Sequence, residues 1–194
     1  MYATLLKRLQ QLIPLNLQQQ KELSFWIQAE EVVKDSVLLE AGQISDHIYF
    51  VDEGVIRSCC NVAHQEVTRW FCLPEHFATS YFSFVYRQPS EDSIVAVTDA
   101  RVLSLSFSAL HTLGQQDPVW VDLNRRILEH YYTRLLSRLL SFQTQSAAER
   151  YASLLQEHPD ITEKVPLGQL ASYLGMTQAT LSRLRSRKNK SKIR

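Results

Sequence analysis

Residues 166–194 read PLGQLASYLGMTQATLSRLRSRKNKSKIR and combine two helical patterns with a run of basic residues. The leucines that would fill the angle between two crossing helices recur at helix-turn-helix spacing: Leu170, Leu174, Leu181 and Leu184. Ala171 is small enough for a close helix crossing, and Gly175 can adopt the positive φ that ends the first helix. Thr177 suits the N-cap of the second helix. Together these features predict a helix-turn-helix.

The second helix of such a unit places its N-terminal residues against base edges in the major groove of DNA. Gln178 can pair with adenine and Arg183 with guanine. Thr180 and Ser182 suit contacts to phosphates or to thymine methyl groups. The predicted DNA-binding residues are Thr177, Gln178, Ala179, Thr180, Ser182, Arg183, Arg185, Arg187 and Lys188. The alternative is a helical hairpin followed by a solvated basic tail.

The charge of the chain is unevenly distributed. The net charge is only +1, but the residues from Asp160 onward hold eight Lys and Arg against two acids, a charge of +6. The preceding residues therefore carry −5. A basic module at one end of a nearly neutral chain is typical of a segment that meets nucleic acid.

The composition is that of a globular protein, with 45% apolar and 21% charged residues in 194. No run of about 18 apolar residues occurs, and the N-terminal pattern indicates an amphipathic helix rather than a signal peptide. We expect a cytoplasmic protein without a membrane partner. The three cysteines (Cys59, Cys60 and Cys72) lack metal-ligand spacing, so we expect buried thiols, no metal and no cofactor.

Three patterns follow one another along the chain. Residues 4–30 read as helical, with a break at Pro14. From about Val32 to Leu105, short runs rich in Val, Ile, Phe, Tyr and Thr alternate with turn residues, which predicts an all-β barrel or jelly roll. Asp117 as N-cap and Pro118 at the first helical position then begin a long helix that nothing breaks before about Phe142.

This long helix is apolar on two faces, so it must pack against two surfaces. One face holds Trp120, Leu123, Ile127 and Tyr131, and the other holds Leu128, Tyr132, Leu135, Leu136 and Leu139. We expect the β block to cover one face and a second copy of the chain to cover the other. The predicted homodimer interface is the first face, Trp120, Leu123, Ile127 and Tyr131. The alternative is a helix buried within one monomer.

A capping box, Ser146 with Glu149, begins the next helix, and the polar connector EHPDITEKVP (157–166) leads into the helix-turn-helix. The sequence thus predicts an α+β chain in three parts. These are a sensor domain over 1–116, a dimerisation helix over 117–143 and a DNA-binding domain over 144–194.

This order resembles the Crp/Fnr family of bacterial transcription regulators over nearly the whole chain. Within EAGQISDHIYFVDEGVIR (40–57), five residues sit at the family's spacing: Gly42, Tyr49, Val51, Gly54 and Arg57. The segment ASYLGMTQATLSRLR (171–185) likewise resembles the family's DNA-binding signature. The resemblance implies a jelly roll of the cyclic-nucleotide-binding type. It also implies a homodimer that activates or represses transcription at a palindromic promoter site, with RNA polymerase as a further partner.

The chain departs from the family at the cassette that binds cyclic AMP. Members that bind it carry Phe-Gly-Glu, whose Glu holds the ribose, and a later Arg that neutralises the cyclic phosphate. Here Phe77 is followed by Ala78 and Thr79, and the segment expected to supply the Arg reads Ser90, Glu91, Asp92. The only nearby base is Arg87. An anionic phosphate would face two carboxylates, so we expect no response to cyclic AMP.

The cassette is instead rich in aromatic rings. An effector pocket is predicted from Phe77, Ala78, Thr79, Tyr81, Phe82 and Phe84. These residues would either line a site for an apolar or aromatic effector or fill a collapsed pocket that binds nothing. The oxygen-sensing members use an N-terminal cysteine cluster, which is missing here. A haem would need Cys72 or His76, residues that in such positions are more often packed than ligating.

Further expectations concern how the chain contacts DNA and whether it has another function. Only about ten residues follow Leu184, so we expect no full β-hairpin wing, and a flexible basic tail, Arg185 to Arg194, would contact phosphates. No histidine, serine or glycine motif of a known catalytic site occurs, so we expect no enzyme and no catalytic residue. The alternative function is a ligand-binding sensor that acts through a protein partner rather than sequence-specific DNA.

Overall fold

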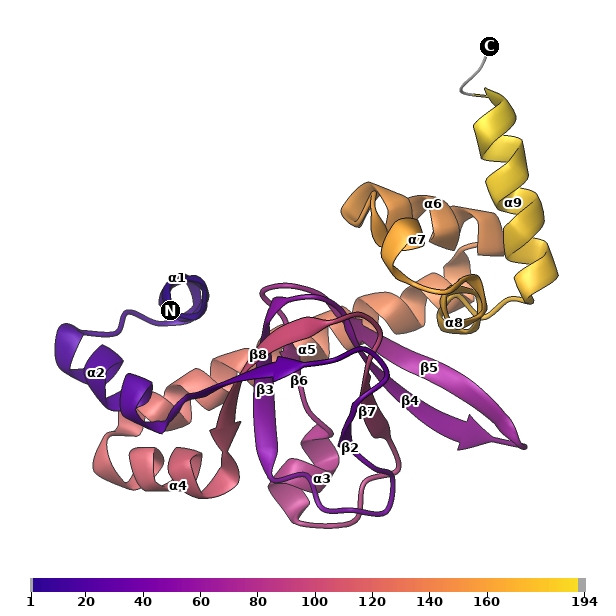
Figure 1. Cartoon of the computed structure of the whole chain (residues 1–194). Helices are drawn as coiled ribbons and strands as arrows, with labels where there is room; N and C mark the ends of the chain where they lie inside the picture. Colours follow the sequence, from indigo (N-terminus) through magenta and orange to yellow (C-terminus); the bar gives the residue numbers. More distant parts are fainter. Residues whose placement is uncertain (1, 192–194) are drawn as a thin grey trace.

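The computed structural model describes residues 2–191, with side chains as far as Ser186. Two four-stranded antiparallel sheets form a β roll, as the sequence predicted (Figure 1). The first sheet has the order β1 (Gln28–Val32), β8 (Ala100–Ser106), β3 (His47–Glu53), β6 (Phe77–Ala78). The second has the order β2 (Val37–Leu39), β7 (Ser93–Ala96), β4 (Ile56–Val62), β5 (Gln65–Cys72). The strand β5 is therefore an edge strand.

The core of the roll is built by strand residues that point between the sheets. Val51, Ile56 and Val102 have no exposed surface, and Ile94 is almost as buried. The turn between β3 and β4 requires glycine at Gly54: its φ is +87°, and a Cβ there would lie 2.4 Å from the carbonyl oxygen of Asp99. This part of the resemblance motif thus has a steric cause.

The N-terminal segment forms two helices, α1 (Ala3–Leu12) and α2 (Leu17–Trp26), on either side of Pro14. The predicted helical segment is too long at its end, because the backbone turns extended at Ile27 and pairs as β1 from Gln28. Three further helices were not predicted: α3 (Tyr81–Tyr86) within the cassette, α4 (Phe107–Gln116) after β8, and the short α7 (Ile161–Lys164) within the connector.

The long helix α5 spans Pro118–Thr144 and runs past the β roll toward the C-terminal helices (Figure 1). Its predicted cap is confirmed, because the Asp117 carboxylate accepts a hydrogen bond of 2.9 Å from the backbone nitrogen of Val119. Trp120 and Leu123 are buried in a core shared with α1, α2 and the roll. One end of α5 is thus fixed within the monomer.

The C-terminal part comprises α6 (Ala147–Glu157), α7 (Ile161–Lys164), α8 (Leu167–Tyr173) and α9 (Gln178–Ser191). The predicted capping box of Ser146 and Glu149 begins α6. The connector is not merely polar, since Ile161 and Val165 are buried and anchor it to the core. The first part of the predicted basic tail continues α9 as far as Ser191, where no Gly or Pro interrupts the helix.

The core of the C-terminal part continues into one end of the β roll. Its buried residues Tyr151, Leu154, Leu170 and Leu174 form one cluster with roll residues, among them Phe71. The C-terminal helices are therefore packed against the sensor. Among the described residues, no helix is both long and apolar enough to cross a membrane.

Candidate nucleic-acid interface and effector cavity

The turn between α8 and α9 has the geometry that the sequence predicted. Gly175 has a φ of +65°, and its backbone nitrogen donates to the carbonyl of Ser172 over 3.1 Å. The nitrogen of Met176 donates to Ala171 over 3.0 Å, which completes a Schellman ending. Thr177 then caps α9 by accepting a 3.2 Å hydrogen bond from the nitrogen of Thr180. These bonds fix the angle between the two helices.

The predicted base-reading side of α9 faces outward. Leu181 is fully buried beneath it, whereas Gln178, Ser182 and Arg183 are exposed. Thr177, Ala179 and Arg185 are exposed too, while Thr180 is half-buried with its hydroxyl at the cap. The side chains of Arg187 and Lys188 lie outside the described residues. The structure therefore brings the described predicted residues to the start and outer side of one helix.

The helix-turn-helix rests on the edge of the second sheet. The backbone nitrogen of Thr68 in β5 donates a 3.0 Å hydrogen bond to Ser172 Oγ of α8. The ring of Tyr173 packs against that of Phe71 with centroids 5.1 Å apart. Arg138 of α5 donates to the carbonyl of Tyr173 over 2.7 Å and lies 3.8 Å from the centre of its ring. Strand, long helix and α8 thus meet at one junction.

Phe142 of α5 supports the same junction from the other side of the turn. Its ring lies between two guanidinium groups, 4.9 Å from that of Arg138 and 4.6 Å from that of Arg150. It also packs on Gly175 so closely that a Cβ there would lie 2.5 Å from the ring. The turn of the helix-turn-helix is therefore in direct contact with the end of α5.

A cavity of about 700 Å³ lies between the roll and α5. Four predicted residues line it: Phe77, Ala78, Thr79 and Tyr81. Most of the remaining lining is apolar and includes Ile94, Ile127 and Leu135. The cassette has therefore not collapsed, and the space beneath it is large enough and apolar enough for a small organic ligand.

Two predicted pocket residues are not part of this cavity. Phe82 is 61% exposed and stacks on Tyr86 at the surface of α3. Phe84 is buried, but its ring packs against that of Phe107. The prediction is wrong for these two residues because the helix α3 turns successive side chains to different faces.

The polar wall of the cavity carries an ion pair where the family's arginine would meet a phosphate. Arg69 donates to the Asp92 carboxylate over 2.7 Å, and Ser58 Oγ donates to the same carboxylate over 3.0 Å. Asp92 is mostly buried. An incoming phosphate would have to displace Asp92 from Arg69 at a cost in desolvated charge.

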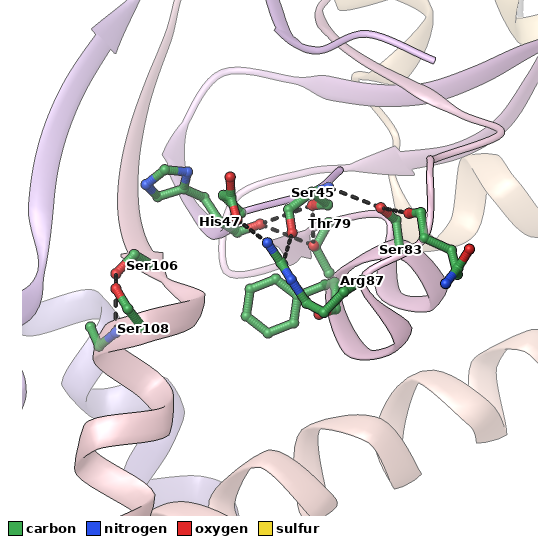
Figure 2. A network of polar contacts seen from close by, with 11 residues as sticks. Ser45, His47, Thr79, Ser83, Arg87, Ser106 and Ser108 are labelled. Carbon is green, nitrogen blue, oxygen red and sulfur yellow. Dashed lines mark hydrogen bonds and ion pairs between the residues drawn. The ribbon is translucent and has the colours of Figure 1, made fainter. Parts of the chain in front are cut away.

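The other polar side chains of the cassette bond to one another or to nearby backbone groups in a network of polar contacts (Figure 2). Ser83 Oγ accepts from the nitrogen of Ser45 over 2.9 Å, and Thr79 Oγ1 donates to the carbonyl of His47 over 3.0 Å. Arg87 donates to the carbonyl of Ser45 over 2.7 Å and pairs with Asp46. Arg87 does not line the cavity, so the base nearest in sequence to Ser90, Glu91 and Asp92 is committed elsewhere.

Neither residue considered as a haem ligand is free. Cys72 Sγ contacts the carbonyl of Phe77 over 3.3 Å, and burial raises the pKa of this thiol to about 12. His76 Nδ1 accepts from the nitrogen of Leu73 over 3.2 Å. Within residues 2–191, no group of three His, Cys, Asp or Glu side chains is arranged to hold a metal ion.

The predicted dimer face requires correction. Trp120 and Leu123 are buried in the monomer core, Ile127 packs against that core, and the Tyr131 hydroxyl bonds to the backbone of Phe77. The uncovered face of α5 is an adjacent one, part of which borders the cavity. Five of its apolar side chains are between 39% and 59% exposed: Leu128, Tyr132, Leu135, Leu139 and Phe142. Their alternating spacing of four and three residues is a heptad pattern that could have identified this face from sequence.

Comparison with known proteins agrees with this architecture. Residues 29–117 match the family model of the cyclic nucleotide-binding domain. The match runs from β1 to the N-cap of α5, so it includes both sheets and the cassette. This segment is a domain of the cyclic nucleotide-binding type. No curated protein matches the chain in sequence.

Solved structures extend the likeness to most of the chain. FixK2 from Bradyrhizobium japonicum is 21% identical over 86% of each chain, with a TM-score of 0.71. A transcriptional regulator of the Crp/Fnr family from Eubacterium rectale is 16% identical over 88% of this chain and 82% of its own, with a TM-score of 0.69. The c-di-GMP responsive global regulator CLP from Xanthomonas campestris is 14% identical over 89% and 91%, with a TM-score of 0.67. The predicted resemblance to the Crp/Fnr family is confirmed at the level of fold.

Proposed function

We propose that the chain is a DNA-binding transcriptional regulator that acts as a homodimer on a palindromic promoter site and does not respond to cyclic AMP. The observation that carries the proposal is the exposed first turns of α9, held at a fixed angle by a capped, Schellman-terminated turn. Gln178 and Arg183 are the side chains suited to read adenine and guanine edges. No ion pair engages Arg183 among the described residues, so its guanidinium is available for a base.

The homodimer is proposed on the heptad face of α5. Apolar side chains at this spacing pack into the matching face of a second, identical helix, which forms a symmetric two-stranded coiled coil. The uncovered face costs free energy in a monomer, because leucine and tyrosine side chains there remain in water. A symmetric dimer also places two recognition helices for two half-sites, which explains the palindrome.

The cavity beneath the cassette is proposed as the site of an apolar or aromatic effector. Its volume of about 700 Å³ and its apolar lining favour such a ligand over an anionic nucleotide. The basic residues near the cassette are committed, since Arg69 pairs with Asp92 and Arg87 pairs with Asp46. Arg138 also lines the cavity, but it donates to the carbonyl of Tyr173.

A mobility-shift titration with promoter fragments from the source genome tests DNA reading. We expect sequence-selective, salt-sensitive binding at physiological ionic strength, since phosphate contacts give the salt dependence and base contacts the selectivity. If random DNA competed equally, the proposal of sequence-specific DNA binding would fail. The alternative, a sensor that acts through a protein partner, would then remain.

Two variants assign roles within the interface. Arg183→Ala should weaken specific binding by about 1–3 kcal/mol and relax selectivity at one base pair. Lys190→Ala, in the basic tail, should mainly reduce the salt slope by about 1. Equal effects of both substitutions on sequence selectivity would contradict the role given to Arg183.

The dimer has its own test. Leu135→Glu places a charge in the centre of the heptad face, so the chain should sediment as a monomer and lose affinity for a two-half-site duplex by about 10-fold or more. Lys21→Glu, at an exposed position of α2 outside the heptad face, is the control and should leave the sedimentation unchanged. A Leu135→Glu chain that remains dimeric would place the interface elsewhere.

A further inference from the structure

A second pocket, of about 390 Å³, lies where α5, α6 and the end of α8 meet. Its lining includes three arginines and three serines: Arg134, Arg138, Arg150, Ser137, Ser141 and Ser153. On α5 these residues recur at intervals of three and four, so they share one face of the helix. Arg150 and Ser153 share a face of α6 in the same way. Two helices thus turn hydrogen-bond donors toward one space.

The charge of this pocket is unbalanced. Six other arginines of the described chain pair with carboxylates: Arg57, Arg69, Arg87, Arg101, Arg125 and Arg126. Among the described residues, no carboxylate forms an ion pair with Arg134, Arg138 or Arg150. The only acid in the lining is Glu157, so the charged side chains there sum to +2. Aromatic rings of Trp70, Phe142 and Tyr173 contact these guanidinium groups, but no carboxylate among the described residues neutralises their charge.

The protein partners of these arginines are neutral and leave donors unused. Arg138 donates to the carbonyl of Tyr173, and Arg150 donates to the carbonyls of Leu174 and Gln145. Each guanidinium has five N–H donors, so several remain for a ligand. Arg134 Nη1 lies 3.1 Å from Nε2 of His76.

Partial burial makes it energetically costly to keep these guanidinium groups charged without an anion. Burial is the main cause that lowers the pKa of Arg138, and the nearby charge of Arg150 lowers it further. A planar guanidinium matches two oxygens of a phosphate in a fork, and several such groups around one pocket favour an anion with more than one charge.

We propose that this pocket, which we call the arginine pocket, binds a small phosphate-bearing anion between α5 and α6. Its volume lies at the lower end of the range for small-molecule sites, and its chemistry differs from that of the apolar cavity beneath the cassette. The bound anion would connect the sensor helix to the helix-turn-helix and hold α8 against β5. Anion binding itself does not depend on the proposed reading of DNA.

Calorimetric titration of the full chain with pyrophosphate at physiological salt tests the proposal. Arg134→Gln should weaken pyrophosphate binding about 10-fold or more, since it removes a charged donor. Arg126→Gln, on the same helix but paired with Asp122, should leave the affinity within about 2-fold.

An exposed position gives a second pair that does not disturb folding. Ser137→Asp adds a negative charge at the pocket and should abolish measurable binding, whereas the neutral Ser137→Asn should bind within about 3-fold of the original chain. Absence of pyrophosphate binding by the unmodified chain, or equal binding by Ser137→Asp, would overturn the proposal. If pyrophosphate does not bind but Arg134→Gln weakens duplex binding, the DNA backbone occupies the pocket and the small-anion site is refuted.

Discussion

The helix-turn-helix and the cassette are both short segments with polar side chains, yet they use those side chains in opposite ways. In the helix-turn-helix, polar groups at the helix ends satisfy the backbone, and Gln178 and Arg183 remain exposed. In the cassette, Ser45, Thr79 and Ser83 bond to one another or to nearby backbone, and Arg87 is paired. An interface is defined by the donors and acceptors that the fold leaves unused. By that measure the first segment is built to bind a polar partner and the second is not.

The largest expected effect tests the rigidity of the reading segment. Gly175→Ala puts a Cβ against the Phe142 ring at a position with a φ of +65°. Left-handed backbone at a non-glycine residue alone costs about 1–3 kcal/mol, and the contact adds to it. We expect a drop in the denaturation midpoint and a matching loss of DNA affinity.

Gly114→Ala is the control for that substitution. Gly114 lies inside α4, and a Cβ there would meet only Val121 at 3.4 Å. Alanine should be neutral or should stabilise the helix by up to about 1 kcal/mol. If both variants had the same stability as the original chain, the turn would not depend on glycine.

A smaller expected effect is a pH dependence of stability, which tests the contact between the start of the cassette and the C-terminal helices. His76 precedes the cassette, and its ring lies 6.2 Å from that of His158 at the end of α6. Burial first, and then the charge of Arg134, lower the pKa of His76 from 6.5 to about 3. Because the unfolded chain binds this proton more readily, His76 contributes stability above about pH 6.5 that is lost as the pH falls toward 3.

His76→Gln isolates this contribution. The amide oxygen of glutamine can accept the Leu73 hydrogen bond, but the side chain does not titrate. As the pH falls from 7 to 5, the melting temperature should decrease less steeply for His76→Gln than for the original chain. Parallel curves would show that the pKa of His76 is the same in the folded and the unfolded chain.

The smallest expected effect is zero. Cyclic AMP at millimolar concentration should not raise the melting temperature, since a ligand stabilises only a fold that binds it. The Asp92 carboxylate already occupies Arg69 in the cavity. A rise of several degrees would mean that the cassette opens to free a cation, and the comparison between the two segments would fail.

The sequence predicted local features, such as helix caps, better than it predicted which face of a helix is buried. Asp117, Ser146 and Thr177 each cap a helix through bonds within three residues, so their patterns were sufficient. Which side of α5 the monomer buries depends on contacts with α1 and β8, far away in the chain. Trp120 and Leu123 were assigned to the wrong surface for that reason.

The cassette shows the same limit. Its departures from the cyclic AMP residues could be predicted from single positions, and so could the presence of Phe77 and Tyr81 near a cavity. The direction of Phe82 and Phe84 could not, because it follows from the helix α3 and its packing on Phe107. The ion pair of Arg69 with Asp92 joins residues 23 positions apart and has no signal in spacing alone.

The hydrogen bond between Thr68 and Ser172 has a consequence for aggregation. β5 is an edge strand, and α8 lies over part of its otherwise open backbone. An open edge is a template for pairing with any other strand, including that of a neighbouring molecule. The helix α8 therefore also shields this edge of the β roll, and we expect a roll deprived of its C-terminal helices to aggregate through β5.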